Sequence, residues 1–237
     1  MSPAVSVYIK ELRGQFFSLT AYVFTVVFLV TSNWLFFQSF FLFNQASLRT
    51  YFDLLPWYLL LLVPAVSMRT WAEEKRQGTA ELLLTLPIPE WQVVVAKFAA
   101  NATFLAAALA FSLTLPLTVA RLGDLDWGPV IGGYLGAWLF GCAYLAMGQW
   151  ISGLTSNQIV AFLATIAASF ALLVSGISIT LASAGPLSDL LYRISTYTHF
   201  QSIAKGVLDL RDIVYFLSLI GLFLYLNVYT LVRRHWR

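Results

Sequence analysis

The chain has 237 residues, of which 59% are hydrophobic and only 11% are charged, and its formal net charge is +3. A soluble domain typically carries about 25% charged residues, so this composition excludes a water-soluble enzyme, a secreted disulfide scaffold and a disordered tail. The single cysteine, Cys142, cannot form an intramolecular disulfide.

The sequence begins with a segment, residues 4–16, that has the pattern of a short amphipathic helix. Its apolar residues recur at helical spacing, and these are Val5, Ile9, Leu12 and Phe16. Lys10, Glu11 and Arg13 occupy the other side. We expect this helix to lie in the cytoplasmic interface of a membrane and to bend at Gly14 and Gln15. The alternative is a plain continuation of the first membrane span.

Six stretches are apolar enough to cross a bilayer, which takes roughly 20 apolar residues in a helix. They are residues 17–43, 54–68, 91–120, 130–152, 158–182 and 213–232. Only Lys97, near the start of the third, places a charge inside such a stretch. The second is short, and Pro64 is expected to break its regularity. The prediction is one all-helical transmembrane domain over residues 1–237, with six spans.

No Asp, Glu or His is expected at mid-membrane depth. Ion-coupled carriers and membrane-embedded acid–base enzymes usually need such a group, so the pattern argues against both. The sequence also lacks a phosphate-binding G-x-x-x-x-G-K-[ST] loop and the common hydrolase motifs. We therefore expect no catalytic residue, no bound cofactor and no metal site in this chain.

Residues 69–89, between the second and third spans, are the most charged part of the chain. The first half has helical propensity, and Gly78 can end that helix in a left-handed conformation. Thr79 can then cap a second helix, which Pro87 stops. The segment is thus predicted to be a helix–break–helix elbow.

The second half of this elbow presents a ridge of leucines flanked by charge, formed by Leu82, Leu83 and Leu86. An exposed apolar ridge of this kind suggests docking to another protein. The alternative is a charged loop that only anchors the topology.

Small residues recur at intervals of four in the fourth span, at Gly133, Ala137 and Gly141. Such spacing allows two helix backbones to approach closely. It can serve either helix packing within the chain or an interface with a second subunit.

Residues 183–212 are too long for a simple turn and are predicted to form two short amphipathic helices at the outer leaflet. An ordinary outer loop is the alternative. His199 lies at the junction of these helices. A hydrogen-bonded structural role is favoured for it over a metal ligand or a proton relay.

Six spans place both termini on the same side of the membrane. With that side cytoplasmic, nine of the 14 Lys and Arg residues lie inside and five outside, as the positive-inside rule requires. The five are Arg49, Arg121, Arg193, Lys205 and Arg211. The basic character therefore reflects membrane orientation, and no nucleic-acid partner is expected.

Two blocks resemble a known family, the ABC-2 type permeases. The first is Arg69-Thr-Trp-Ala-Glu-Glu-Lys-Arg-Gln-Gly-Thr-Ala-Glu-Leu-Leu-Leu-Thr-Leu-Pro87, followed by Lys97. It is similar to the family's Arg…Glu-Glu…Gly-Thr-x-Glu-Leu-Leu…Pro…Lys signature. The second, residues 199–215, is less specific. The chain looks closest to the gliding-motility (GldF-like) and nitrous-oxide-maturation (NosY-like) branch.

The resemblance implies a type V exporter-like fold in which the elbow is the coupling helix seated in an ATPase subunit. The residues expected to contact that subunit are Trp71, Glu73, Glu74, Arg76, Gly78, Thr79, Glu81, Leu82 and Leu83. Residues 183–212 would form an outer hairpin in which His199 and Phe200 act as a gate. An extracytoplasmic accessory protein is a further partner that the resemblance allows.

The resemblance also implies the other subunits of the complex, its location and its function. Two copies of a separate ATPase subunit would bind ATP and Mg²⁺, and a second permease half, identical or related, would complete the complex in the bacterial inner membrane. The chain itself would be non-catalytic, would contact lipid, and would serve export of a substrate that the sequence does not reveal. The alternative is a transmembrane force or signal transmitter that moves no substrate and acts on an extracytoplasmic partner.

Overall fold

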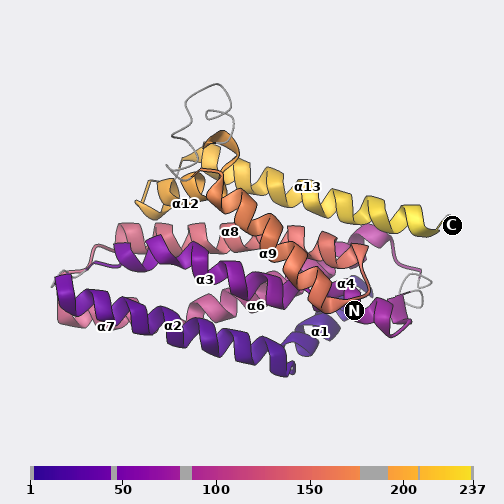
Figure 1. Ribbon diagram of the computed structural model, residues 1–237, viewed down its shortest axis with the longest axis horizontal. Coiled ribbons are helices and arrows are strands. Elements are labelled where there is room, and N and C mark those ends of the chain that lie inside the picture. Colours follow the sequence, from indigo (N-terminus) through magenta and orange to yellow (C-terminus); the bar gives the residue numbers. More distant parts are fainter. Residues whose placement is uncertain (1–2, 44–46, 81–86, 177–191, 208, 236–237) are drawn as a thin grey trace.

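The computed structural model describes residues 3–43, 47–80, 87–176, 192–207 and 209–235, and within these ranges the chain is helical without strands (Figure 1). The helices are α1 (Pro3–Phe16), α2 (Leu19–Phe43), α3 (Arg49–Ser67), α4 (Arg69–Arg76), α6 (Glu90–Phe111), α7 (Thr114–Leu122), α8 (Trp127–Leu154), α9 (Gln158–Val174), α12 (Thr196–Ala204) and α13 (Leu210–His235).

Five helical segments are long and apolar enough to cross a membrane. They are Leu19–Gln38, Arg49–Arg76, Glu90–Leu122, Trp127–Leu154 and Leu210–Arg233. The apolar helix α9 is shorter, with 17 residues. The expected fifth span, residues 158–182, runs beyond it into positions outside the described residues. The described chain is thus a multi-pass helical bundle with five clear membrane-length segments.

Both termini lie at the same end of the bundle as α4, whereas α7 and α12 lie toward the opposite end (Figure 1). We refer to these as the α4 end and the α12 end. Helix α1 does not simply extend α2. Its last residues are followed by a break at Phe17 and Ser18, and it packs along α6. The expected bend at Gly14 and Gln15 is therefore wrong, because the helix continues through both residues to Phe16.

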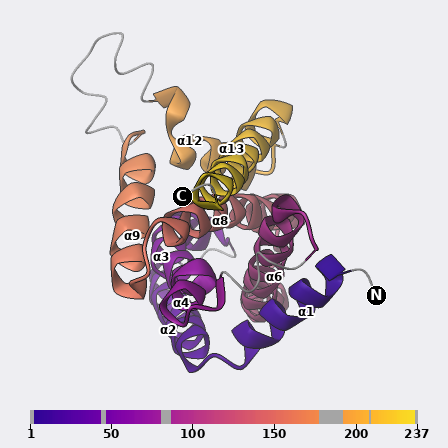
Figure 2. The same ribbon diagram turned by 90° about the vertical axis from the view of Figure 1, so that its right-hand side faces the viewer.

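Helix α8 lies at the centre of the bundle, in contact with α3, α4, α6, α9, α12 and α13 (Figure 2). In an apolar 18-residue window of α8, 78% of the residues are buried, against 11% in the corresponding window of α13. A helix enclosed on so many sides needs small residues wherever a neighbour crosses closely.

The stripe of small residues in α8 meets that need within the chain. A Cβ added at Gly133 would lie 2.5 Å from the ring of Phe52 in α3, and one at Gly141 would lie 2.4 Å from Leu105 in α6. Ala137, between them, is fully buried. In this structure these three residues pack against helices of the same chain.

A second set of glycines in α8 faces α12. A Cβ at Gly132 would lie 2.6 Å from the carbonyl oxygen of Ile203, and one at Gly136 would lie 3.1 Å from the Ile203 side chain. Helix α12 ends just beyond, where Gly206 has a φ of +85° and its Cβ position is 3.2 Å from the backbone nitrogen of Pro129. Glycine therefore permits the close contact between α8 and α12.

Two expected spans differ from the helices found. The second, residues 54–68, begins earlier, at Arg49, and α3 runs unbroken through Pro56 and Pro64. Proline is tolerated here because α3 packs against α2, α8 and α9, which hold the helix in place despite one missing hydrogen bond. The prediction that Pro64 breaks the helix was wrong.

The third expected span, residues 91–120, is interrupted between α6 and α7 at Ser112 and Leu113. Pro116 has no N–H to donate to the carbonyl of Ser112, so the helix cannot continue regularly. The carbonyl of Ser112 accepts instead from the backbone amide of Leu115 at 3.0 Å and from the hydroxyl of Tyr134 at 3.0 Å. The sequence rule that proline interrupts a helix thus applies at Pro116 but not at Pro64.

Candidate functional site

The first helix of the predicted elbow and the break after it are present at the α4 end. Helix α4 follows α3 directly and stops at Gly78, whose φ of +71° is left-handed, as the sequence predicted. The predicted second helix begins at Thr79, but Glu81, Leu82 and Leu83, three of the expected contact residues, lie outside the described residues. Their place in an ATPase contact stays a prediction.

Helix α4 is fastened to the end of α8 by Ser152. The Ser152 hydroxyl accepts hydrogen bonds from the backbone amides of Trp71 at 3.1 Å and Ala72 at 3.0 Å, and donates to the carbonyl of Met68 at 2.8 Å. The ammonium of Lys75 donates to the carbonyl of Gly153. The first amides of a helix have no partner within the helix, so a hydroxyl from α8 acts here as the cap of α4.

We expect Ser152→Ala to destabilise the protein by about 1–2 kcal/mol, because two buried amides lose their acceptor. Denaturation in detergent micelles, followed by circular dichroism, measures the change. Ser218→Ala is the matched control, because the Ser218 hydroxyl bonds only within α13. A loss below about 0.5 kcal/mol for Ser152→Ala, equal to that of the control, would contradict the capping role.

The two faces of α4 have different surroundings. Trp71 is fully buried and Glu74 has 9% of its surface exposed, whereas the side chain of Arg76 is 63% exposed. Gly78 and Thr79 are also exposed. Trp71 thus faces the interior of the bundle and Glu74 exposes little of its surface, and their expected contact with another subunit stays a prediction.

Glu73 lies at the edge between the two faces. Its carboxylate is 3.0 Å from the guanidinium of Arg76 and 3.5 Å from that of Arg69, and it accepts hydrogen bonds from Gln77 and from Gln158 of α9. Its side chain is 18% exposed. The outer surface of α4 and of the turn that follows it thus consists of Arg76, Gln77, Gly78 and Thr79, with Glu73 at its margin.

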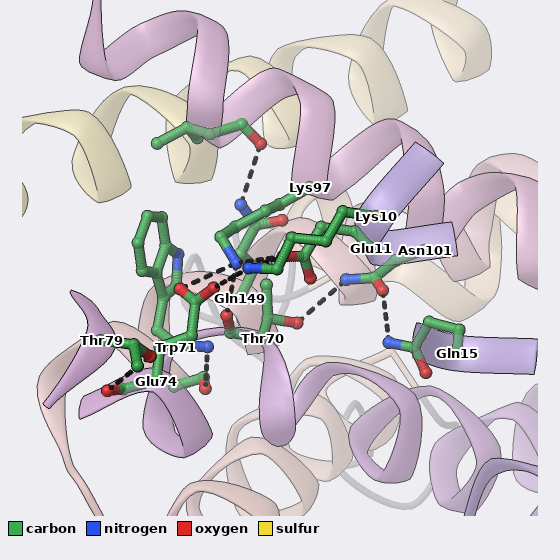
Figure 3. A network of polar contacts seen from close by, with 12 residues as sticks. Lys10, Glu11, Gln15, Thr70, Trp71, Glu74, Thr79, Lys97, Asn101 and Gln149 are labelled. Carbon is green, nitrogen blue, oxygen red and sulfur yellow. Dashed lines mark hydrogen bonds and ion pairs between the residues drawn. The ribbon is translucent and has the colours of Figure 1, made fainter. Parts of the chain in front are cut away.

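The inner face of α4 leads into a buried cluster of charges (Figure 3). The ammonium of Lys97, in α6, lies 2.9 Å from the carboxylate of Glu74 and 2.9 Å from that of Glu11 in α1. It also donates to the carbonyl of Thr70 at 3.1 Å and sits 4.8 Å from the ring centre of Trp71. Its side chain has no exposed surface.

Lys10 of α1 completes the cluster. Its ammonium donates to Glu74 at 3.0 Å and lies 3.5 Å from Glu11. Burial alone would lower the pKa of Lys10, but the hydrogen bond to Glu74 and the charges of Glu74 and Glu11 raise it above its usual value. The four-charge cluster (Lys10, Glu11, Glu74 and Lys97) therefore has two positive and two negative groups and balances internally.

Amide side chains extend this network toward α1. The Asn101 amide donates to the hydroxyl of Thr70 at 3.0 Å, and Gln15 donates to Asn101 at 2.7 Å and to the carbonyl of Val66 at 3.3 Å. From α8, Gln149 donates to the carbonyl of Val94 at 3.0 Å. The network fixes α1, α4 and α6 relative to one another.

Sequence reasoning missed this cluster. It placed Lys10 and Glu11 on the polar outer side of α1 and gave Lys97 no partner, although Lys97 was the one charge within an expected span. A charge inside an apolar stretch must find an opposite charge, because its desolvation is otherwise too costly. Lys97 was thus the signal that could have led to Glu74 and Glu11.

At the α12 end, His199 joins α12 to α13. Its Nδ1 atom lies 2.6 Å from the carboxylate of Asp212, its Nε2 atom lies 3.1 Å from the carbonyl oxygen of Arg193, and its ring stacks on Tyr215 at 4.0 Å. Over the described ranges, no three His, Cys, Asp or Glu side chains are grouped to hold a metal ion. These contacts suit the structural role favoured for His199.

Phe200, the other residue expected at a gate, is fully buried. Its ring lies 5.7 Å from that of Phe140 in α8. It belongs to the contact between α12 and α8, and its expected role at a gate stays a prediction. Residues 183–191, the first part of the expected outer hairpin, lie outside the described residues.

Comparison with protein families gives a match over most of the chain. The family described as "ABC-2 family transporter protein" matches residues 58–233, which is 176 of the 237 residues. The match runs from within α3 to within α13 and includes α4, Lys97 and α12. Comparison with curated proteins gives no match. The chain therefore belongs to the ABC-2 transporter family, whose members are the membrane permeases of ABC transporters.

Proposed function

We propose that this chain is one permease half of an ATP-driven exporter of the GldF-like and NosY-like branch. Two copies of a separate ATPase subunit would bind ATP and Mg²⁺, and this chain would convert their movement into export of a substrate. The chain itself would supply no catalytic residue. Family membership supports the permease role, and the geometry of the α4 end supports the coupling role.

The observation that carries the coupling role is the difference between the two surfaces of α4. Its outer surface is exposed, while its inner surface is bonded to α8 through Ser152 and to α1 and α6 through the four-charge cluster. A subunit that pushed on Arg76 or Thr79 would therefore move several helices together. Coupling of this kind needs rigid elements in continuous contact, which these bonds provide.

We further propose six passes, with α9 as the sixth, and both termini in the cytoplasm of a bacterium. Termini at one end of the bundle require an even number of crossings, and α9 runs between the two ends beside α3 and α8 (Figure 1). The excess of Lys and Arg at the α4 end supports a cytoplasmic position for that end.

A second permease half, identical or related, is the proposed neighbour within the membrane. Helices α2 and α13 lie on the outside of the bundle with large apolar side chains exposed, among them Trp34 at 73% and Tyr225 at 68%. Such surfaces suit lipid and the second half. The stripe of Gly133, Ala137 and Gly141 is already occupied within the chain.

The test is a charge reversal on the outer surface of α4. We expect Arg76→Glu to lower Mg²⁺-dependent ATPase activity that co-purifies with the chain by at least about tenfold, which corresponds to about 1.4 kcal/mol, because like charges repel each other at an interface. The free energy of unfolding should hardly change, since the pair with Glu73 is near the surface.

Arg121→Glu is the control, because Arg121 is equally exposed but lies at the end of α7, away from α4. The proposed contact would be refuted if Arg76→Glu retained as much ATPase activity as this control.

A further inference from the structure

A cavity of about 390 Å³ opens at the α12 end, opposite the elbow. The start of α3, the loop between α7 and α8 and the end of α12 form its walls. Its floor is apolar and includes Leu48, Phe52 and Val130, all buried. Its volume is in the range of small-ligand sites, about 300–1,000 Å³. The polar groups in its walls are Arg49, Asp53, Asp124, Asp126, Gln201 and Lys205.

The charged groups of this cavity form no ion pairs with one another in the described structure. Among the ion pairs of the described residues, none within 4.0 Å involves Arg49, Asp53, Asp124, Asp126 or Lys205. By contrast, the charges at the α4 end are paired at 2.9–3.5 Å. Opposite charges that share a cavity without contact are available to a ligand that carries both signs.

Other bonds hold two of these carboxylates in place. The amide of Gln201 donates to Asp53 at 3.2 Å and to the hydroxyl of Tyr197 at 2.7 Å. Asp126 accepts from the backbone amide of Gly128 at 3.0 Å and caps α8. The two acids, Asp124 and Asp126, belong to the loop between α7 and α8, whereas Arg49 begins α3 and Lys205 follows α12. The charges of both cations act on Asp53 of α3. The two acids of the loop and the two cations thus come from different segments that line the cavity.

We propose that this cavity binds a compact zwitterion with a primary ammonium and a phosphate, the chemistry of a phosphoethanolamine group. Asp124 and Asp126 would accept hydrogen bonds from the ammonium, and Arg49 and Lys205 would bind the phosphate, for which guanidinium and ammonium groups are suited. A phosphatidylethanolamine headgroup and free phosphoethanolamine are the two sources of this chemistry.

The surroundings favour the lipid as the source. Leu122, Trp127 and Val207 flank the cavity-lining segments in sequence and are 63%, 45% and 64% exposed. Exposed apolar residues with a tryptophan are typical of the membrane–water interface, where lipid headgroups lie. The cavity has room for the headgroup, while the acyl chains would remain in the bilayer.

Native mass spectrometry of the purified full-length chain in detergent tests the proposal. The protein is titrated separately with palmitoyl-oleoyl phosphatidylethanolamine, phosphatidylcholine and phosphatidylglycerol. We expect phosphatidylethanolamine to bind at least about fivefold more tightly than the other two, which corresponds to about one hydrogen bond of discrimination. Asp124→Asn should remove this fivefold preference, because it removes an acceptor for the ammonium. Lys205→Gln should weaken the binding of phosphatidylethanolamine by about the same factor, because it removes a partner of the phosphate.

Arg121→Gln is the control, because it removes a positive charge at the same end without lining the cavity. Circular dichroism confirms that each variant keeps its helices. Displacement of the lipid by millimolar phosphoethanolamine would identify the free compound as ligand, and failure to displace it would identify the lipid headgroup.

Equal binding of the three lipids, or unchanged binding in both cavity variants, would overturn the proposal. The measurement uses no ATPase subunit, so its outcome is independent of the Arg76→Glu test.

Discussion

Replacement of Lys97 by methionine is expected to lower the free energy of unfolding by about 3–5 kcal/mol. The ammonium of Lys97 lies 2.9 Å from both Glu11 and Glu74, and among the ion pairs of the described residues no other cation lies so close to both. Without it, two carboxylates that are mostly buried share one remaining cation, Lys10. Denaturation in detergent micelles measures the loss.

Lys10→Met is the matched control. Lys10 contacts the same two carboxylates, but its side chain is 61% exposed, so we expect a loss of about 1 kcal/mol or less. Adding Glu74→Gln to Lys97→Met should recover part of the loss, because it removes one unpaired charge. A Lys97→Met protein as stable as Lys10→Met would show that the cluster does not hold these helices together.

Gly132→Ala is expected to cost about 2–3 kcal/mol, a value typical of overpacking. The added methyl group would lie 2.6 Å from the carbonyl oxygen of Ile203 and 3.2 Å from the Cα atom of Gly206. Both are backbone atoms, so no side-chain rotation can relieve the contact and α12 must move away from α8. Denaturation gives the cost, and hydrogen exchange in α12 should accelerate.

Gly221→Ala provides the comparison, since a Cβ there would meet nothing within 4 Å. Because alanine favours the helix over glycine, we expect no loss and a gain of up to about 1 kcal/mol. If both substitutions had the same effect, the close packing of α12 on α8 would not be the cause.

The sequence predicted those features of the fold that depend on nearby residues. Apolar runs identified the membrane helices, and the left-handed end of α4 at Gly78 followed from glycine after a polar helix. The opposite behaviour of Pro64 and Pro116 could not be predicted in this way. Both prolines are buried, but α3 packs against α2, α8 and α9, whereas α7 after the break is exposed along much of its length. What a proline does thus depends on packing that a single segment does not reveal.

The candidate site was predicted in position but not in orientation. The polar run after Ser67 located the elbow, yet an eight-residue helix with charges on every side has no pattern that says which face is buried. The side chain of Glu74 points into the bundle because it pairs there with Lys97 and Lys10. Lys97 lies 23 residues later in the chain and Lys10 lies 64 residues earlier. Only the tertiary structure brings these residues together.

The attachments at the two ends of α8 have a mechanical consequence. Helix α12 packs closely on Gly132 at one end of α8, and Ser152 caps α4 at the other end. The two positions are 20 residues apart, which is about 30 Å at the usual helical rise. Helix α8 also contains Val130, which lines the cavity at the α12 end. Under the proposed function, a tilt or slide of α8 caused by movement of α4 would therefore also displace α12 at the opposite end of the bundle. Measuring how nucleotide state alters occupancy of that cavity would read out this transmission directly.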